Sequence, residues 1–135
     1  MYRHVLVPIA IEHGEGTKTA LAAARLLADK GAQITALTVL EPVPAFIANE
    51  LPEGQIERTS IDVMAALRDE LEGNDDIKPV VITGHPGRAI VAFADENGVD
   101  CIVVASHKPG LADYFLGSTA ARVVRHARCA VHVVR

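Results

Sequence analysis

The sequence predicts an α/β fold in which helices cover both faces of a parallel sheet. Two observations support this prediction. Short apolar runs typical of buried strands alternate with amphipathic helical segments along the whole chain, and this alternation is typical of parallel sheets. Right-handed crossovers then favour a doubly wound sheet. A chain of 135 residues has the size of one domain, so we expect a single domain over residues 1–135.

Five segments have the character of strands. The first, residues 2–9, is short, apolar and β-branched, which indicates burial on both faces of a sheet. The later strands are expected at residues 33–40, 79–83, 101–104 and Ala130–Val134.

Four segments have helical periodicity. The clearest is 119–127, where Ala120, Val123, Val124 and Ala127 recur at i, i+3, i+4 and i+7. The other helices are expected at 17–30, 55–72 and 89–97, each followed by a glycine that can end a helix. Residues 41–53 contain three prolines and are expected to be irregular.

Composition excludes several classes of protein. The net charge is −4, and Lys and Arg are dispersed, which argues against nucleic-acid binding and against an acidic membrane surface. No apolar run approaches the roughly 20 residues of a membrane span, and the N-terminus has no signal-peptide pattern. We therefore expect a cytoplasmic protein, in which Cys101 and Cys129 are buried free thiols.

The glycine-rich segment after the first strand resembles a nucleotide loop only partly. In GEGTKT, Thr17 stands where a Walker A motif needs the glycine before its lysine, and Thr19 stands where GxGxxG needs its last glycine. The simpler interpretation is a turn in which Thr17 caps the next helix. A response-regulator receiver is excluded, because Ala10 and Ile11 occupy the positions of its metal-binding acids.

The sequence offers neither a metal site nor a catalytic group. His13, His85 and His107 each follow a strand, but no carboxylate or cysteine stands at ligand spacing from them. Ser106 and Ser118 have no evident His and acid partners. We therefore expect no metal and no dedicated enzyme.

The segment ASHKPGLADYFLGST, after the fourth strand, is the strongest candidate for a binding site. If the strand order is 3-2-1-4-5, the order reverses between the first and fourth strands, where ligands of such sheets bind. The loops 10–16 and 105–117 would then converge. Gly117, Ser118 and Thr119 open a helix whose free N–H groups suit a phosphate. An equally good alternative is that Ser118 caps its own helix.

From RHVLVPIA at the start to GSTAARVVRHA near the end, the chain resembles the universal stress protein family. The resemblance spans nearly the whole chain and is most specific from CIVVASHKPG onwards. It implies the 3-2-1-4-5 sheet of the adenine nucleotide alpha hydrolase-like fold, which is Rossmann-like. It also implies an adenine-nucleotide cleft in many members, and a homodimer through the fifth strand, Ala130–Val134.

The resemblance also assigns residues to the nucleotide. The adenine would pack near Pro8, Ile9 and Val39, and Ala10 would face the ribose. Ribose and phosphates would meet residues of the following loop and helix, which are Ala105, Ser106, His107, Lys108, Gly110, Gly117, Ser118 and Thr119.

Two positions depart from the nucleotide-binding pattern of that family, G-x2-G-x9-G-[ST]. Its final Gly-[Ser/Thr] is intact as Gly117-Ser118, but its first glycine is replaced around Ala105. Ala10 stands where the family often has an Asp near the ribose, and the loss of this acceptor is expected to weaken ATP binding.

The sequence thus predicts a stress-response module that binds ATP, with Mg²⁺ only as the counter-ion of the nucleotide. The alternative is a dimeric interaction protein that needs no nucleotide. Slow ATP hydrolysis would be incidental, because no general base is evident.

Overall fold

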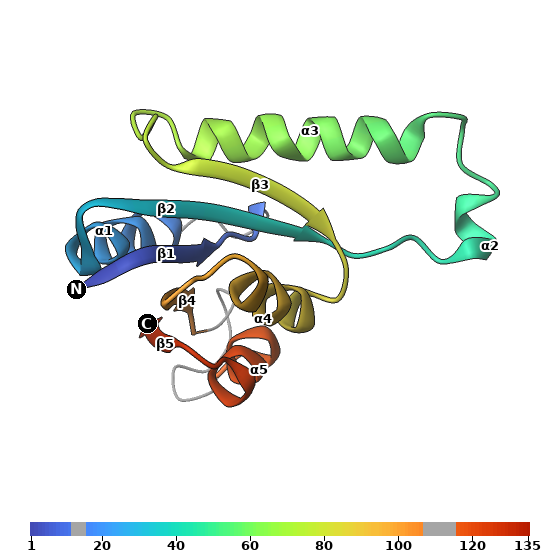
Figure 1. The fold of residues 1–135 in the computed structure, drawn as a ribbon. Helices are drawn as coiled ribbons and strands as arrows, with labels where there is room; N and C mark the ends of the chain where they lie inside the picture. The colour runs from blue at the N-terminus through green and yellow to red at the C-terminus, as the bar shows by residue number, and fades with distance from the viewer. Residues whose placement is uncertain (12–15, 107–115) are drawn as a thin grey trace.

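The computed structural model describes residues 1–11, 16–106 and 116–135. In this part of the chain, five parallel strands form one sheet in the order β3-β2-β1-β4-β5, with helices on both faces (Figure 1). The predicted fold class and strand order are confirmed.

The strands occupy the predicted segments, with one notable difference at the start of the second. β1 spans Tyr2–Pro8, β3 Lys78–Thr83, β4 Cys101–Ala105 and β5 Ala130–Val134. β2 spans Ala28–Leu40 and therefore begins well before the predicted residue 33. The helical prediction for 28–30 was wrong, because the chain turns into the strand directly after Leu27.

The helices are α1 at Thr17–Leu27, α2 at Ala45–Ala48 and α3 at Gln55–Glu70, followed by α4 at Pro86–Glu96 and α5 at Ser118–His126. The short helix α2 lies in the segment that was expected to be irregular. α4 begins earlier than predicted, at Pro86, because proline fits the first turn of a helix, where its missing N–H costs nothing.

The sheet separates two apolar clusters. Side chains alternate along β1, so that Val5 and Val7 pack on the α1 face while Leu6 packs on the face of α4 and α5. Cys101 belongs to the first cluster, and burial raises the pKa of its thiol to about 11. Cys101 and Cys129 are both free, as predicted; Cys101 is buried, whereas Cys129 is only partly buried.

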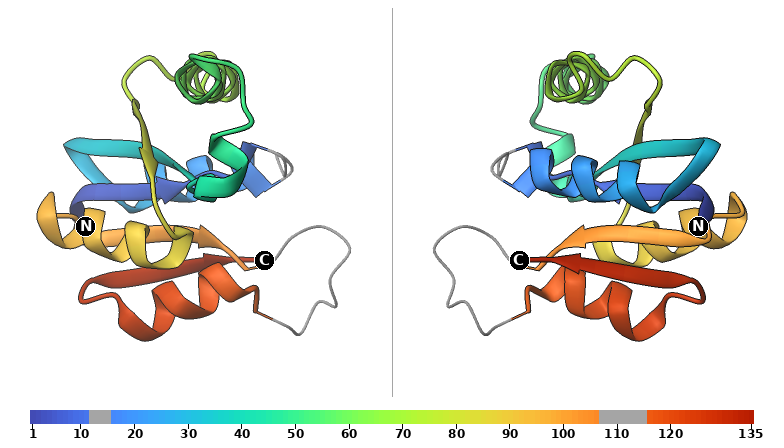
Figure 2. Two further views of the ribbon diagram at one scale, coloured as in Figure 1. Left: turned by 90° about the vertical axis from the view of Figure 1, so that its right-hand side faces the viewer. Right: turned by 90° about the vertical axis from the view of Figure 1, so that its left-hand side faces the viewer.

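α3 buries fewer of its residues than the other long helices do. Leu67 is its one buried residue within the helix, and the helix runs along β3 at the edge of the sheet (Figures 1 and 2). Residues 41–58, which comprise the link after β2, α2 and the first turn of α3, project beyond the ends of the strands (Figure 1). We call this segment the arm.

No helix in the described ranges is both long and apolar enough to span a membrane.

Candidate functional site

The site expected from the sequence lies where β1 and β4 end side by side. The two strands pair in parallel, with Val5 opposite Cys101 and Leu6 opposite Ile102. Asp100 fixes this alignment, because its carboxylate accepts the backbone N–H groups of Arg3 and His4, both at 2.9 Å. The point at which the strand order reverses is therefore between β1 and β4, as predicted.

The start of α1 contacts the end of β4 at this edge. A Cβ atom placed on Gly16 would lie 3.5 Å from the Cβ of Ala105, which is ordinary van der Waals contact. Ala105 is the last residue of β4, and it is exposed at the carboxyl end of the strand. The far end of the first loop and the near end of the second thus meet, as the topology predicts.

β2 holds the end of β1 in place. The N–H of Ile9 donates to the carbonyl of Leu37 at 2.8 Å, and the hydroxyl of Thr38 donates to the carbonyl of Ile9 at 2.9 Å. Thr38 is 5% exposed, so this hydrogen bond is protected from water. Thr38 was not predicted as a residue of the site, although a hydroxyl inside the apolar run ITALTVL was a signal for it.

The sheet separates the residues that were assigned to the adenine. Ile9 packs in the α1 cluster, whereas Val39 packs against the cluster of α4 and α5. Pro8 is half-buried at the end of β1. Ala10 follows as an exposed residue whose methyl group provides no hydrogen-bond acceptor.

Ser106 joins three elements through its backbone. Its N–H donates to the carbonyl of Val134 at the end of β5, at 2.8 Å, and its carbonyl accepts the N–H of Gly117. The residue is 2% exposed. These hydrogen bonds bring the start of α5 back to the carboxyl end of β4, which is the placement that the sequence predicted for residues 117–119.

The N-terminus of α5 has no side-chain cap in the part of the chain that is described. Gly117 is the N-cap residue, in extended backbone (φ −61°, ψ 156°), and Ser118 is the first helical residue. Ser118 is exposed and Thr119 half-buried. The alternative that Ser118 caps its own helix is therefore wrong, and the first-turn N–H groups and the helix dipole favour an anion here.

The expected cap of α1 is also wrong. Gly16 occupies the N-cap position, no side chain among the described residues caps the helix, and Thr17 is 5% exposed inside its first turn. Threonine is a preferred N-cap residue, and the prediction rested on that preference alone. In the structure Thr17 lies one position further along, as the first residue of the helix, and its side chain is buried and does not cap the helix.

Three residues of the predicted site lie outside the described ranges of the chain. His107, Lys108 and Gly110 lie outside the described residues, as does His13. Within the described ranges, no three His, Cys, Asp or Glu side chains gather in a metal-binding cluster.

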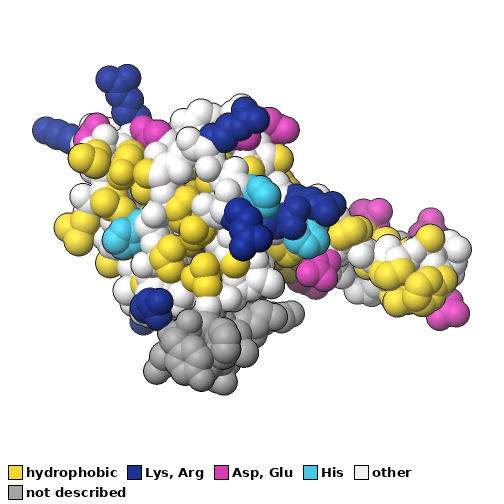
Figure 3. All heavy atoms as spheres, turned by 90° about the horizontal axis from the view of Figure 1, so that it is seen from below, with side chains coloured by type: hydrophobic (Ala, Val, Ile, Leu, Met, Phe, Trp, Pro, Cys, Tyr) yellow, Lys and Arg dark blue, Asp and Glu magenta, His cyan; other side chains and the backbone are white. Residues whose placement is uncertain are grey.

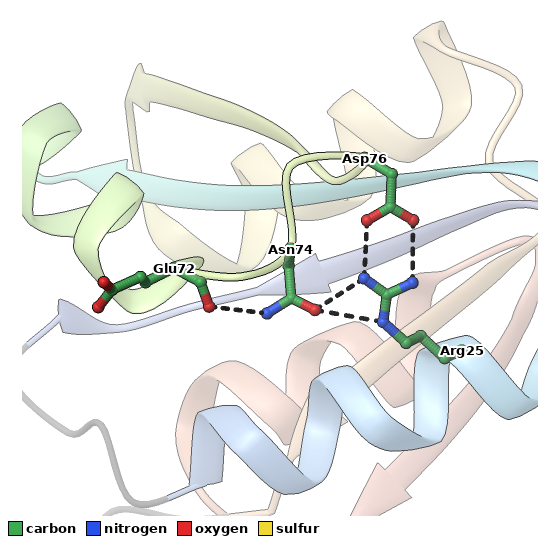
Figure 4. A network of polar contacts seen from close by, with 4 residues as sticks. All are labelled: Arg25, Glu72, Asn74 and Asp76. Carbon is green, nitrogen blue, oxygen red and sulfur yellow. Dashed lines mark hydrogen bonds and ion pairs between the residues drawn. The ribbon is translucent and has the colours of Figure 1, made fainter.

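A polar cluster that the sequence did not reveal fixes the other end of α1 (Figure 4). The guanidinium of Arg25 donates to both carboxylate oxygens of Asp76, at 2.7 and 2.9 Å, and to Oδ1 of Asn74. These hydrogen bonds lower the pKa of the Asp76 carboxyl. α1 is thus tied to the turn between α3 and β3, while its first residues contact the candidate site.

Comparison with known proteins gives one consistent family. The model of the universal stress protein family matches residues 1–135. A universal stress protein of Methanothermobacter thermautotrophicus is 31% identical over 144 residues, which cover 100% of this chain and 97% of that protein.

Solved structures share the fold. A universal stress protein in complex with cAMP has a TM-score of 0.74 at 23% identity, over 99% of this chain and 97% of that one. A universal stress protein from Archaeoglobus fulgidus in complex with dAMP has a TM-score of 0.62 at 18% identity, over 99% of this chain and 98% of that one.

Proposed function

Because the chain belongs to the universal stress protein family, we propose that it binds an adenine nucleotide, with ATP as the physiological ligand, between the ends of β1 and β4. The observation that carries this proposal is the uncapped start of α5, which Ser106 holds at the point where the strand order reverses. An uncapped helix N-terminus is suited to phosphate. The cAMP and dAMP complexes of proteins with the same fold support the choice of an adenine ligand.

The proposed roles follow from the positions of the residues. Ser118 and Thr119 donate their hydroxyl and backbone N–H groups to the phosphates, and Gly117 leaves room for the ligand to approach the backbone. Pro8 and Val39, half-buried at the strand ends, provide apolar surface for the base. Mg²⁺ would enter only as the counter-ion of the phosphates.

The protein would act as a cytoplasmic binding module in the stress response rather than as a dedicated enzyme. We further propose that it forms a homodimer through β5, the edge strand opposite β3. Its valines are partly buried, and among the described residues β4 is its one neighbouring strand; pairing with a second copy removes the liability of a free edge. A monomer in sedimentation at micromolar concentration would contradict the dimer without affecting the nucleotide proposal.

Titration with a fluorescent ATP analogue tests the nucleotide proposal. We expect saturable binding by the wild type and its loss in Gly117→Val. The backbone of Gly117 is extended and suits valine, so the variant should fold normally while its isopropyl group obstructs the phosphates. Ala65→Val, on the exposed side of α3, is the matched control and should bind like the wild type.

One observation favours a second candidate function, that of an interaction protein that needs no nucleotide. Ala10 presents a methyl group at the end of β1, where a ribose hydroxyl would need an acceptor. Under this alternative, the purified protein carries no nucleotide and the titration shows no saturation at millimolar ligand. Mass spectrometry of small molecules released on denaturation separates the two candidates.

A further inference from the structure

The arm combines exposed apolar side chains with negative charge. Phe46 is 73% exposed, Ile47 40% and Val43 38%. The same segment, residues 41–58, contains one basic residue, Arg58, and four acidic ones, which are Glu41, Glu50, Glu53 and Glu57. Exposed apolar side chains among polar residues are typical of an interaction site.

A group of basic side chains lies on α4 and α5, and we call it the basic patch. His85 and Arg88 flank the start of α4, and Arg122, Arg125 and His126 share one side of α5, at i, i+3 and i+4. The two helices meet here: a Cβ atom on Gly87 would lie 2.5 Å from Cδ of Arg122.

The basic patch has no acidic partner within the described part of the chain. The two ion pairs found there join Met1 to Asp29 and Arg25 to Asp76. Except for Arg122, which is partly buried, the residues of the basic patch are exposed. The positive charge of Arg88 and Arg125 is therefore available to another molecule.

The arm and the helices of the basic patch lie side by side on one face of the molecule. Seen from below, basic side chains gather over these helices, next to the projecting arm with its apolar and acidic side chains (Figure 3). A second molecule can be related to the first by a twofold axis that lies in the plane of this face, midway between the arm and the basic patch. This rotation would place the arm of each molecule on the basic patch of the other. The surface is thus complementary to itself in charge, which is what a symmetric pair of identical chains requires.

From this arrangement we propose that a second copy of this chain binds through reciprocal contacts between the arm and the basic patch. The contact differs from the proposed pairing of β5, because that pairing uses the outer edge of β5 itself, whereas the arm follows β2 and leads into α3, and the basic patch lies on α4 and α5. Apart from Arg122, its acidic and basic groups are exposed, so we expect the association to weaken as salt rises.

Charge reversal with mixing tests the proposal. The arm variant is Glu50→Arg with Glu53→Arg, and the patch variant is Arg122→Glu with Arg125→Glu. Each variant alone brings like charges together at both contacts and should associate more than about tenfold more weakly than the wild type in sedimentation velocity. An equimolar mixture should recover association, since each arm then meets a patch of opposite charge.

Any contribution of β5 pairing is equal in the mixture and in the separate variants. The difference in association between them therefore reports on the contact between the arm and the basic patch. If a double variant fails to fold, Glu53→Lys and Arg125→Glu, both at exposed positions, provide a milder pair. Variants that associate like the wild type would overturn the proposal. So would a mixture that stays as weak as its components.

Discussion

At the scale of single residues, Ala10 is where the chain departs most clearly from a nucleotide-binding pattern. Its backbone position is well defined, because Ile9 before it is tied to β2 by two hydrogen bonds. A missing side-chain acceptor, rather than a displaced strand, would therefore account for any weakness in ribose binding.

This leads to a prediction for Ala10→Asp. A carboxylate at this exposed position could accept a ribose hydroxyl, and one such hydrogen bond contributes roughly 1 kcal/mol, or about fivefold in affinity. We expect ATP to bind about fivefold more tightly, as measured by calorimetric titration. Ala10→Leu is the control without an acceptor and should not improve binding. Equal affinities of Ala10→Asp and the wild type would argue against a ribose at this position.

Residue types alone misplaced both helix caps. Thr17 and Ser118 have the side chains that N-cap positions prefer, yet the N-caps are Gly16 and Gly117. The sequence could not reveal this, because burial of Thr17 and the hydrogen bond from Gly117 to Ser106 depend on the assembled sheet.

At the scale of elements, periodicity predicted every strand and long helix, but not all their ends. Gly31 was taken as a helix stop, whereas it lies within β2 with φ +79°. The β1–β2 register is irregular there, since Tyr2 pairs with Ala28 but His4 with Gln33. Glycine adopts a positive φ readily both at the end of a helix and at an irregularity within a strand, so the sequence alone could not distinguish the two.

The contact between α4 and α5 gives a prediction at this scale. A Cβ atom on Gly87 would lie 2.5 to 3.1 Å from Cδ, Cβ and Cγ of Arg122. Gly87→Ala should therefore lower the free energy of unfolding by about 1–3 kcal/mol, as measured by urea denaturation. In Arg122→Ala, two of the three crowded atoms are absent, so Gly87→Ala should cost less in that background. Equal costs in both backgrounds would show that the crowding is not what matters.

At the scale of the whole molecule, the alternation of strands and helices was sufficient to predict the doubly wound sheet, and the resemblance to a family added the strand order. The position of the site followed, because the topology determines where strand order reverses. The arm and the basic patch were not foreseen. Lys and Arg are dispersed along the sequence, but the fold packs the start of α4 against α5 and so brings the basic residues of these two helices together.

NMR titration of the ¹⁵N-labelled protein with ATP is the most direct test of the proposed nucleotide site at the start of α5. We expect saturable shifts in the backbone amide signals, largest at Gly117, Ser118 and Thr119 and smaller at Ala105 and Ser106. These shifts should be absent in Gly117→Val. Amide signals that stay unchanged at millimolar ATP, or that shift only in other parts of the chain, would contradict the proposed site.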